Sequence, residues 1–170
     1  MIMKSINDGK NFRVVTGSPR ETKKLAQKIF QENKKELRNR CLIFALQGEL
    51  GTGKTQLAKG LGRALGIKET IVSPSFTLIR EYPFEVGGRR GIFYHLDAWR
   101  IETAEEWLAL DVRGLIKPGN VVAIEWPEKG RETWDKIFDS LAVKVVWVNL
   151  EHQGKGERII SQPRRLGGPE

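Results

Sequence analysis

The segment from Gly48 to Thr55 constrains the fold of this chain more than any other stretch. It reads Gly-Glu-Leu-Gly-Thr-Gly-Lys-Thr and matches the phosphate-binding loop pattern G-x-x-x-x-G-K-[ST] at every fixed position. The glycines allow a tight turn in which successive backbone N–H groups point inward and form an anion-binding nest. In this pattern Lys54 reaches the β- and γ-phosphates of a nucleotide, and the hydroxyl of Thr55 ligates Mg²⁺.

The sequence on both sides of this loop supports the assignment. Residues 41–46 form a continuous apolar run, which is typical of a buried parallel strand. After the loop, Leu57, Leu61 and Leu65 recur at helical spacing, and the helix is expected to end near Gly66. The order of strand, loop and helix predicts an α/β fold of the P-loop NTPase type. We expect a sandwich with a mostly parallel central sheet, flanking helices and added antiparallel strands.

The rest of the chain alternates between strand and helix patterns. Ser18, Pro19 and Glu21 resemble the capped start of a helix whose apolar face continues to Leu37. Residues 73–75 have turn chemistry, residues 85–91 resemble a hairpin turn, and residues 118–120 form another turn. Strands are expected at residues 12–16, 76–82, 92–97, 121–124 and 141–150, with an edge strand at 157–161; helices are expected at 104–112 and around Trp134 to Phe138.

Two carboxylates stand at the ends of predicted strands. Asp97 closes one apolar strand and Glu125 directly follows another, which is where α/β sheets place their chemistry. Together with Thr55 they make a candidate site for a metal ion and a water molecule. Glu128 lies beyond Pro127 and is expected to face solvent, so Glu125 is the carboxylate expected to matter for hydrolysis.

Two nearby features have both a functional and a structural interpretation. Residues 73–77 follow the first helix after the loop, where P-loop NTPases often sense the γ-phosphate, but an ordinary Ser/Pro turn explains them equally well. His95 is interpreted as a packed strand residue rather than a catalytic base.

Length, charge and cysteine content set the remaining bounds. The 170 residues predict one domain over residues 1–161, with a mobile Pro/Gly-rich tail at 162–170. No apolar run reaches 18 residues and no secretory signal is evident, and the single Cys41 suits a reducing cytoplasm, where it is expected in the core. The net charge of +8 fits either attraction to a polyanion or a solubilising surface.

Four blocks in the chain resemble the TsaE family, bacterial ATPases needed for threonylcarbamoyladenosine (t6A) modification of tRNA. They are residues 48–55, Ser-Pro-Ser-Phe-Thr-Leu at 73–78 with Glu81-Tyr82, His-Leu-Asp-Ala-Trp-Arg at 95–100, and Glu-Trp-Pro-Glu at 125–128. The loop is shared by a vast superfamily, whereas the combination is specific. Ser75, Trp99 and Gln56 depart from the family pattern, in which Thr, Tyr and Thr are usual.

The resemblance implies an ATP- and Mg²⁺-dependent site. Thr55 and Glu125 would ligate Mg²⁺, Asp97 would sit by the metal or the attacking water, and the 73–77 segment would act as a switch. Lys54, Asp97 and Glu125 are the implied catalytic residues; the implied nucleotide-binding residues are Glu49, Gly51, Thr52, Gly53, Lys54, Thr55 and Gln56.

The resemblance also implies partners. The family works with the TsaB–TsaD heterodimer and contacts tRNA only indirectly through it, so neither a membrane nor DNA is expected as a partner. The implied role is hydrolysis of ATP that resets this complex between turnovers, in a pathway that modifies adenosine 37 of tRNAs reading codons that begin with A.

Three other functions use the same features. A small-molecule or nucleoside kinase has the same loop but needs an acceptor pocket and usually an Arg-rich lid, and Arg89, Arg90 and Arg131 are too sparse to form one. A GTPase would carry an Asn-Lys-x-Asp motif after the loop, and none occurs. An RNA-binding module would use the positive charge, but no interleaved aromatic and basic motif supports it.

Overall fold

A computed structural model describes residues 5–7, 12–139 and 142–162. Within these residues the strands form one eight-stranded mixed sheet in the order β1-β2-β8-β7-β3-β6-β5-β4. The four central strands β7, β3, β6 and β5 are parallel, and the other neighbours pair antiparallel. The strands are β1 (Ser5–Asn7), β2 (Phe12–Thr16), β3 (Cys41–Gln47), β4 (Ile79–Val86), β5 (Arg89–Asp97), β6 (Val121–Glu125), β7 (Val143–His152) and β8 (Arg158–Ser161).

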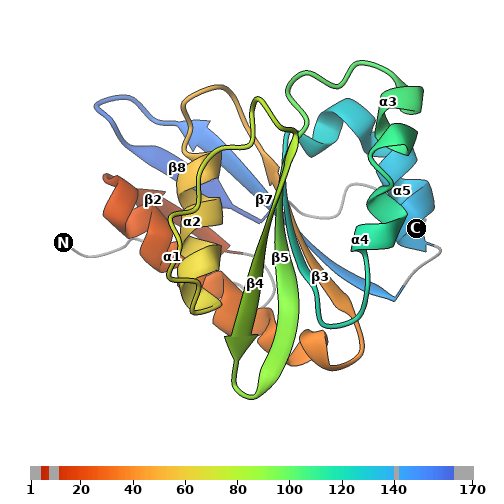
Figure 1. Ribbon diagram of the computed structural model, residues 1–170. Coiled ribbons are helices and arrows are strands. Elements are labelled where there is room, and N and C mark those ends of the chain that lie inside the picture. The colour runs from red at the N-terminus through yellow and green to blue at the C-terminus, as the bar shows by residue number, and fades with distance from the viewer. Residues whose placement is uncertain (1–4, 8–11, 140–141, 163–170) are drawn as a thin grey trace, which may run out of the picture.

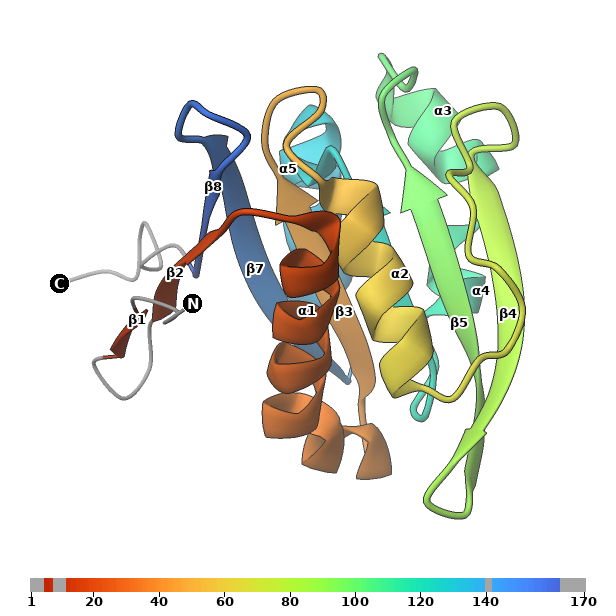
Figure 2. The same cartoon turned by 90° about the vertical axis from the view of Figure 1, so that its left-hand side faces the viewer.

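Helices cover both faces of this sheet. The helices are α1 (Pro19–Asn33), α2 (Lys54–Ala64), α3 (Ala104–Ala109), α4 (Val112–Leu115) and α5 (Arg131–Asp139), with 3₁₀ turns η1 (Lys34–Arg38) and η2 (Pro127–Gly130). Figures 1 and 2 show α1 and α2 side by side on one face and α3, α4 and α5 on the other. The α/β sandwich with a mostly parallel centre and added antiparallel strands is therefore confirmed.

Strand β3 explains why both faces must be covered. Every residue from Cys41 to Leu46 is buried. Successive side chains alternate between the two layers, so Phe44 packs with the α1 and α2 side while Ile43 packs with the α3 to α5 side. Each such side chain stabilises the fold by about 1.5–3 kcal/mol through removal from water. The strand therefore fixes the position of the loop that follows it.

Helices α1 and α2 pack at unusually close range. A Cβ atom at Gly60 of α2 would lie 2.6 Å from the backbone oxygen of Lys23 and 2.6 Å from the Cβ of Ala26, both on α1. The start of α1 is fixed as its sequence predicts: the hydroxyl of Ser18 accepts from the N–H of Glu21, and the carboxylate of Glu21 accepts from the N–H of Gly17. Helix α2, which begins at Lys54, is thus fixed in position by its close packing against α1.

Three predicted elements differ in extent from the structure. The strand expected at 76–82 begins only at Ile79, because the N–H groups of Thr77 and Leu78 both donate to the carbonyl of Pro74 and close a turn. The hairpin turn expected at 85–91 is confined to Gly87 and Gly88, both at positive φ. The helix expected at 104–112 breaks into α3 and α4, with a positive φ of 43° at Asp111 between them.

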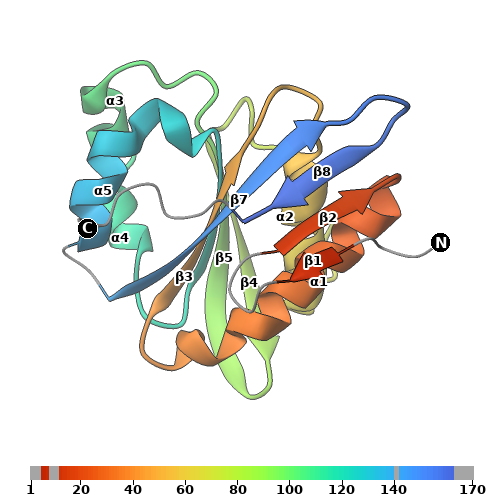
Figure 3. The same ribbon diagram turned by 180° about the vertical axis from the view of Figure 1, so that it is seen from behind.

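Elements near the two ends of the chain also differ from the prediction. The predicted edge strand at 157–161 is an inner strand, since β8 pairs with both β7 and β2, as Figure 3 shows. Strand β1 was not predicted, and α1 ends at Asn33, with Leu37 in the 3₁₀ turn η1. Strand β7 begins at Val143 and runs on to His152. Residues 140–141 lie outside the described residues, as does the mobile tail predicted at 162–170 from residue 163 onward. Of the helices described, none is both long and apolar enough to cross a membrane.

One edge of the described sheet is formed by β4, which among the described strands pairs only with β5. Pro83 lies opposite Ile92, whose N–H donates away from β4 to the side chain of Asn120. The two residues therefore form a pair without a hydrogen bond, and the nitrogen of Pro83, which carries no hydrogen, faces outward from the sheet. Arg80, Glu81 and Glu85 of the same strand are exposed.

Candidate nucleotide-binding site

The phosphate-loop segment connects the end of β3 to the start of α2. Gly51 and Gly53 have φ angles of 78° and 101°, a conformation that glycine adopts without a steric penalty. Gly48 is also at positive φ, and a Cβ there would collide with the backbone carbonyl oxygen of Leu150 on β7. The three glycines are thus required by the path of the loop, which places the N-terminus of α2 at the carboxyl ends of the parallel strands.

Lys54 is buried in the centre of this loop. Its Nζ donates to the carbonyls of Gly48 at 2.6 Å and Glu49 at 2.9 Å, and it lies 3.7 Å from the ring centroid of Trp126. Burial lowers the pKa of Lys54, and the nearby Glu125 and Glu128 oppose this shift. Among the described residues it forms no ion pair, so backbone carbonyls and an aromatic face hold its amino group in place.

A cleft of about 430 Å³ opens in front of Lys54. It combines the phosphate loop, the ends of β5 and β6, the 73–77 segment and one residue from β8. Its lining residues are Pro19, Leu50, Gly51, Gly53, Lys54, Thr55, Gln56, Ser73, Ser75, Asp97, Trp99, Glu125, Trp126 and Arg158. Ligand sites in open α/β sheets lie at this end of the strands.

The two predicted carboxylates stand side by side in the cleft. Asp97 and Glu125 are register partners on the parallel strands β5 and β6, and both are buried. One oxygen of Asp97 accepts from the hydroxyl of Ser75 at 2.6 Å, and the other accepts from the N–H of Trp99 at 3.0 Å. These two bonds fix the orientation of the Asp97 carboxylate.

His95 holds the other carboxylate. Its Nε2 lies 2.8 Å from Oε1 of Glu125, and its Nδ1 lies 3.2 Å from the carbonyl oxygen of Val72. Because a carbonyl only accepts, Nδ1 is the donor to Val72, and the contact with Glu125 must contain a second proton. His95 is fully buried, as predicted for a packed strand residue, but its hydrogen bonds also link Glu125 to the segment before Ser73.

The 73–77 segment turns back over the carboxylates. The hydroxyls of Ser73 and Ser75 lie 2.7 Å apart, and Ser75 continues this chain of hydrogen bonds to Asp97. Phe76 is 88% exposed, and Leu78 at the end of the turn has a positive φ of 62°. The hydroxyls of Ser73 and Ser75 therefore line the cleft beside the carboxylates, whereas the ring of Phe76 points outward into solvent.

Other predicted site residues differ in where they lie. The side chain of Glu49 is exposed and that of Thr52 is buried, with its hydroxyl donating to the carbonyl of Glu49, and neither lines the cleft. Gln56 lines the cleft with a buried Oε1 that has no hydrogen-bond partner among the described residues. Glu128 does not face solvent as expected: burial raises its pKa, and its Oε2 is buried without a described partner. The reason is that η2 turns the chain back at Pro127.

Two residues of the site were not predicted from the sequence. Trp126 belongs to one of the four blocks that resemble the family but has no predicted role, and its ring lies against the amino group of Lys54. Arg158 lies far away in sequence, at the first position of β8, and carried no local signal. It reaches the loop only because β8 inserts between β7 and β2, a pairing that no short pattern encodes.

The donor set fits a magnesium ion bound together with phosphates. No group of three or more His, Cys, Asp or Glu side chains in the described part of the chain forms a metal cage. Mg²⁺ in nucleotide sites takes one or two protein oxygens, with waters and phosphate oxygens completing the octahedron. The hydroxyl of Thr55 and the carboxylates of Asp97 and Glu125 line the same cleft and are oxygen donors of this kind.

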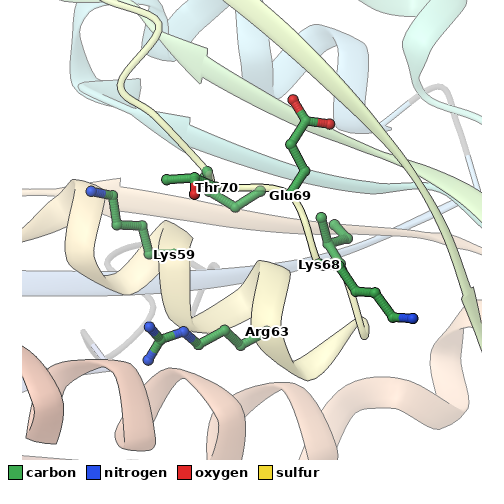
Figure 4. Close-up of a pocket in the computed structure, with 7 residues that line it drawn as sticks. Lys59, Arg63, Lys68, Glu69 and Thr70 are labelled. Carbon is green, nitrogen blue, oxygen red and sulfur yellow. The ribbon is translucent and has the colours of Figure 1, made fainter.

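A second, smaller hollow lies behind the C-terminal part of α2 (Figure 4). It has a volume of about 140 Å³ and is lined by Lys59, Arg63, Ile67, Lys68, Glu69, Thr70 and Ile71. In Figure 4 the amino group of Lys68 points to the opposite side from the amino group of Lys59 and the guanidinium of Arg63. The cations therefore do not converge on one position, which an anion site would require.

Comparison with known proteins gives a consistent result. The family model described as threonylcarbamoyl adenosine biosynthesis protein TsaE matches residues 16–160. Proteins named tRNA threonylcarbamoyladenosine biosynthesis protein TsaE from Treponema pallidum and Bacillus subtilis are 38% and 36% identical over 70% of this chain, and over 79% and 67% of their own lengths. The protein of that name from Synechocystis sp. is 47% identical over 51% of this chain and 55% of its own length, so the chain spans about half the length of that relative.

The fold comparison agrees. The crystal structure of YdiB from Bacillus subtilis superposes with a TM-score of 0.57 and 25% sequence identity, covering 90% of this chain and 84% of that chain. The phosphate loop, the paired strand-end carboxylates and the family match over residues 16–160 point the same way. The chain belongs to the TsaE family.

Proposed function

We propose that this protein binds ATP with Mg²⁺ and hydrolyses it as a component of t6A formation in tRNA. The observation that carries the proposal is the amino group of Lys54. It is buried, free of ion pairs among the described residues, and held in the centre of the anion-binding loop beside the cleft. A buried lysine that forms no direct ion pair with a described carboxylate is suited to receive a phosphate. Relatives named for tRNA threonylcarbamoyladenosine biosynthesis support the tRNA part of this proposal.

Each lining residue has a role in this proposal. The loop N–H groups from Gly51 to Lys54 and the Lys54 amino group bind the phosphates, and the Thr55 hydroxyl and Glu125 hold Mg²⁺. A Mg²⁺ ion held there would neutralise negative charge on the phosphates. Asp97, fixed by Ser75 and the Trp99 N–H, orients the attacking water. Positioning and charge stabilisation of this kind supply most of the catalysis of phosphoryl transfer.

We further propose that the isolated protein is a slow ATPase and that the TsaB–TsaD heterodimer stimulates it. The cleft is open, and three large apolar side chains around it are exposed: Leu50 by 74%, Phe76 by 88% and Trp99 by 46%. A partner that covers them would exclude water and order the 73–77 segment. In this proposal hydrolysis resets that complex between turnovers in the cytoplasm, and tRNA is contacted through the partners.

The experiment measures ATP affinity and phosphate release, with and without TsaB–TsaD, for wild type and two variants. Lys54→Ala should lose charge-assisted contacts worth about 1.5–3 kcal/mol each, which is roughly a tenfold to hundredfold loss of affinity. Lys59→Ala is the matched control, because Lys59 lies on the same helix but outside the cleft. Unchanged affinity and hydrolysis in Lys54→Ala would show the assignment to be wrong.

A cellular test addresses the pathway. Cells that carry only Lys54→Ala should lose t6A from their tRNA, even where the variant still binds TsaB–TsaD. Normal t6A with a variant confirmed to be ATPase-dead would leave a structural role for the protein. Phosphate transfer from ATP to an added nucleoside or small molecule, in place of release to water, would favour the kinase alternative.

A further inference from the structure

Arg158 contributes a second cation to the cleft that contains Lys54. These two are the only Lys or Arg residues that line it among the described part of the chain. Arg158 is the first residue of β8, which is held on both sides by β7 and β2 and is therefore a firm platform for a side chain. Its position in the sheet, rather than any neighbouring motif, brings it to the phosphate loop.

The side chain of Arg158 packs against the loop backbone at Gly53. A Cβ at Gly53 would lie 3.5 Å from the Cδ and 3.6 Å from the Nε of Arg158. Gly53 has a φ of 101° and directly precedes Lys54, so its N–H belongs to the group that turns toward an anion. The guanidinium is therefore adjacent to the backbone donors of the candidate phosphate site.

The hydrogen bonding of Arg158 is incomplete. Its Nε is buried and has no hydrogen-bond partner among the described residues, and no described carboxylate forms an ion pair with it. The one described hydrogen bond of its side chain is a long one, from Nη1 to the hydroxyl of Thr22 at 3.4 Å. A buried N–H donor of a charged group is ordinarily paired, so an unpaired one in a side chain that lines a cleft indicates that this side chain has a ligand.

A purely structural role, tying β8 to α1 through Thr22, explains less. The hydroxyl of Thr22 already donates to the carbonyl of Ser18 at 3.2 Å and lies 3.1 Å from the hydroxyl of Thr16. It does not need Arg158 for its own satisfaction. A tie of this kind would also leave Nε without a partner, which is the feature to be explained.

We infer that Arg158 is a phosphate-binding residue for the nucleotide, and this inference rests on the proposed function. Its planar guanidinium can donate two hydrogen bonds to phosphate oxygens, a geometry that lysine cannot reproduce. Lys54 and Arg158 then bind the phosphate chain together. The contact is to the phosphates rather than to the base, since the guanidinium lies against the loop residue whose N–H binds phosphate.

The test is equilibrium binding of ATP, ADP and adenosine, each with Mg²⁺, to the full chain and three variants. Arg158→Gln should weaken ATP and ADP about tenfold to a hundredfold and leave adenosine binding unchanged. Arg158→Lys keeps the stem against Gly53 and the charge but loses the paired donors, so it should bind ADP severalfold more weakly than wild type. Arg13→Gln, an exposed arginine on the neighbouring strand β2, controls for net charge and should bind like wild type.

Two outcomes would overturn this inference alone. In the first, wild type binds ATP and Lys54→Ala does not, yet Arg158→Gln and Arg158→Lys both bind ATP and ADP as tightly as wild type. In the second, adenosine binding falls as much as ADP binding, which would make Arg158 a base contact. Failure of wild type to bind ATP at all would instead refute the proposed function. Circular dichroism and thermal unfolding establish whether each variant is folded. If Arg158→Gln does not fold, the nucleotide affinities of Arg158→Lys decide whether Arg158 binds phosphate.

Discussion

Replacement of His95 by alanine tests the buried pair that holds the strand-end carboxylate. The side chains of His95 and Glu125 are 0% and 5% exposed, and Nε2 and Oε1 are 2.8 Å apart. The substitution removes the proton donor and leaves Oε1 of Glu125 in a buried position without its described partner. It also frees the carbonyl of Val72, which the ring now binds.

The expected loss of stability follows from the burial of the pair. Removing one partner of a buried, hydrogen-bonded ionisable pair costs about 3–5 kcal/mol, because the other group is left in the interior without its partner. For a domain of this length each kcal/mol lowers Tm by about 2–4 °C. His95→Ala should therefore unfold roughly 6–20 °C below wild type. Because Glu125 borders the cleft, water can enter and solvate its carboxylate after the substitution. The decrease in Tm should therefore lie in the lower half of that range.

Thermal and urea unfolding in EDTA provide the measurement, since chelation keeps Mg²⁺ from replacing the lost partner. The decisive comparison is with His95→Ala/Glu125→Gln, which keeps the cavity of the first substitution but removes the buried charge. The double variant should be more stable than His95→Ala alone, with a coupling energy of about 0.5–3 kcal/mol. A Tm for His95→Ala within about 2 °C of wild type would refute the reasoning. So would a double variant no more stable than the single one.

Three further experiments test other parts of the structure. Gly60→Ala should lower the unfolding free energy, because the added Cβ meets the backbone of α1. This overpacking costs about 1–3 kcal/mol, and the roughly 1 kcal/mol by which a helix favours alanine over glycine offsets part of it. Gly62→Ala, whose Cβ comes nearest to the side chains of Ile71 and Ile67, should be the milder change in urea unfolding. Burial raises the pKa of Glu128 above its usual 4.5, so the native state favours the protonated form and loses stability as pH rises through the folded pKa. Glu128→Gln should therefore be more stable than wild type at neutral pH, with the difference disappearing below about pH 4.5 in a series of urea titrations; an equal difference at both ends of the series would contradict this assignment. Burial raises the pKa of the Cys41 thiol to about 12, so iodoacetamide at pH 8 should label it only after unfolding, and rapid labelling of the native protein would be the contrary result.

Local patterns predicted the centre of this fold well. The apolar run of β3, the glycine pattern of the loop and the spacing of Leu57, Leu61 and Leu65 are short-range signals, and each has its physical cause within a few residues. The placement of Asp97 and Glu125 side by side was also predictable, because parallel strands that end in carboxylates meet at one sheet edge.

Features that depend on distant pairing were not predictable. His95 and Glu125 are 30 positions apart, and the contact of Arg158 with Thr22 spans 136 positions. Strand β8 had the composition of an edge strand and became an inner one only through its pairing with β2. Glu128 was misplaced for a local reason of a different kind, since the 3₁₀ turn after Pro127 returns the chain to the protein interior.

The outward nitrogen of Pro83 has a consequence for association with other chains. An incoming strand that docks along β4 needs a continuous row of donors and acceptors, and the row lacks a donor at Pro83. The charges of Arg80, Glu81 and Glu85 further oppose edge-to-edge pairing, so this rim resists the templated sheet growth that leads to aggregation. Strand addition is thereby disfavoured as a mode of complex formation along β4, and a partner is expected to engage loops and side chains there rather than extend the sheet.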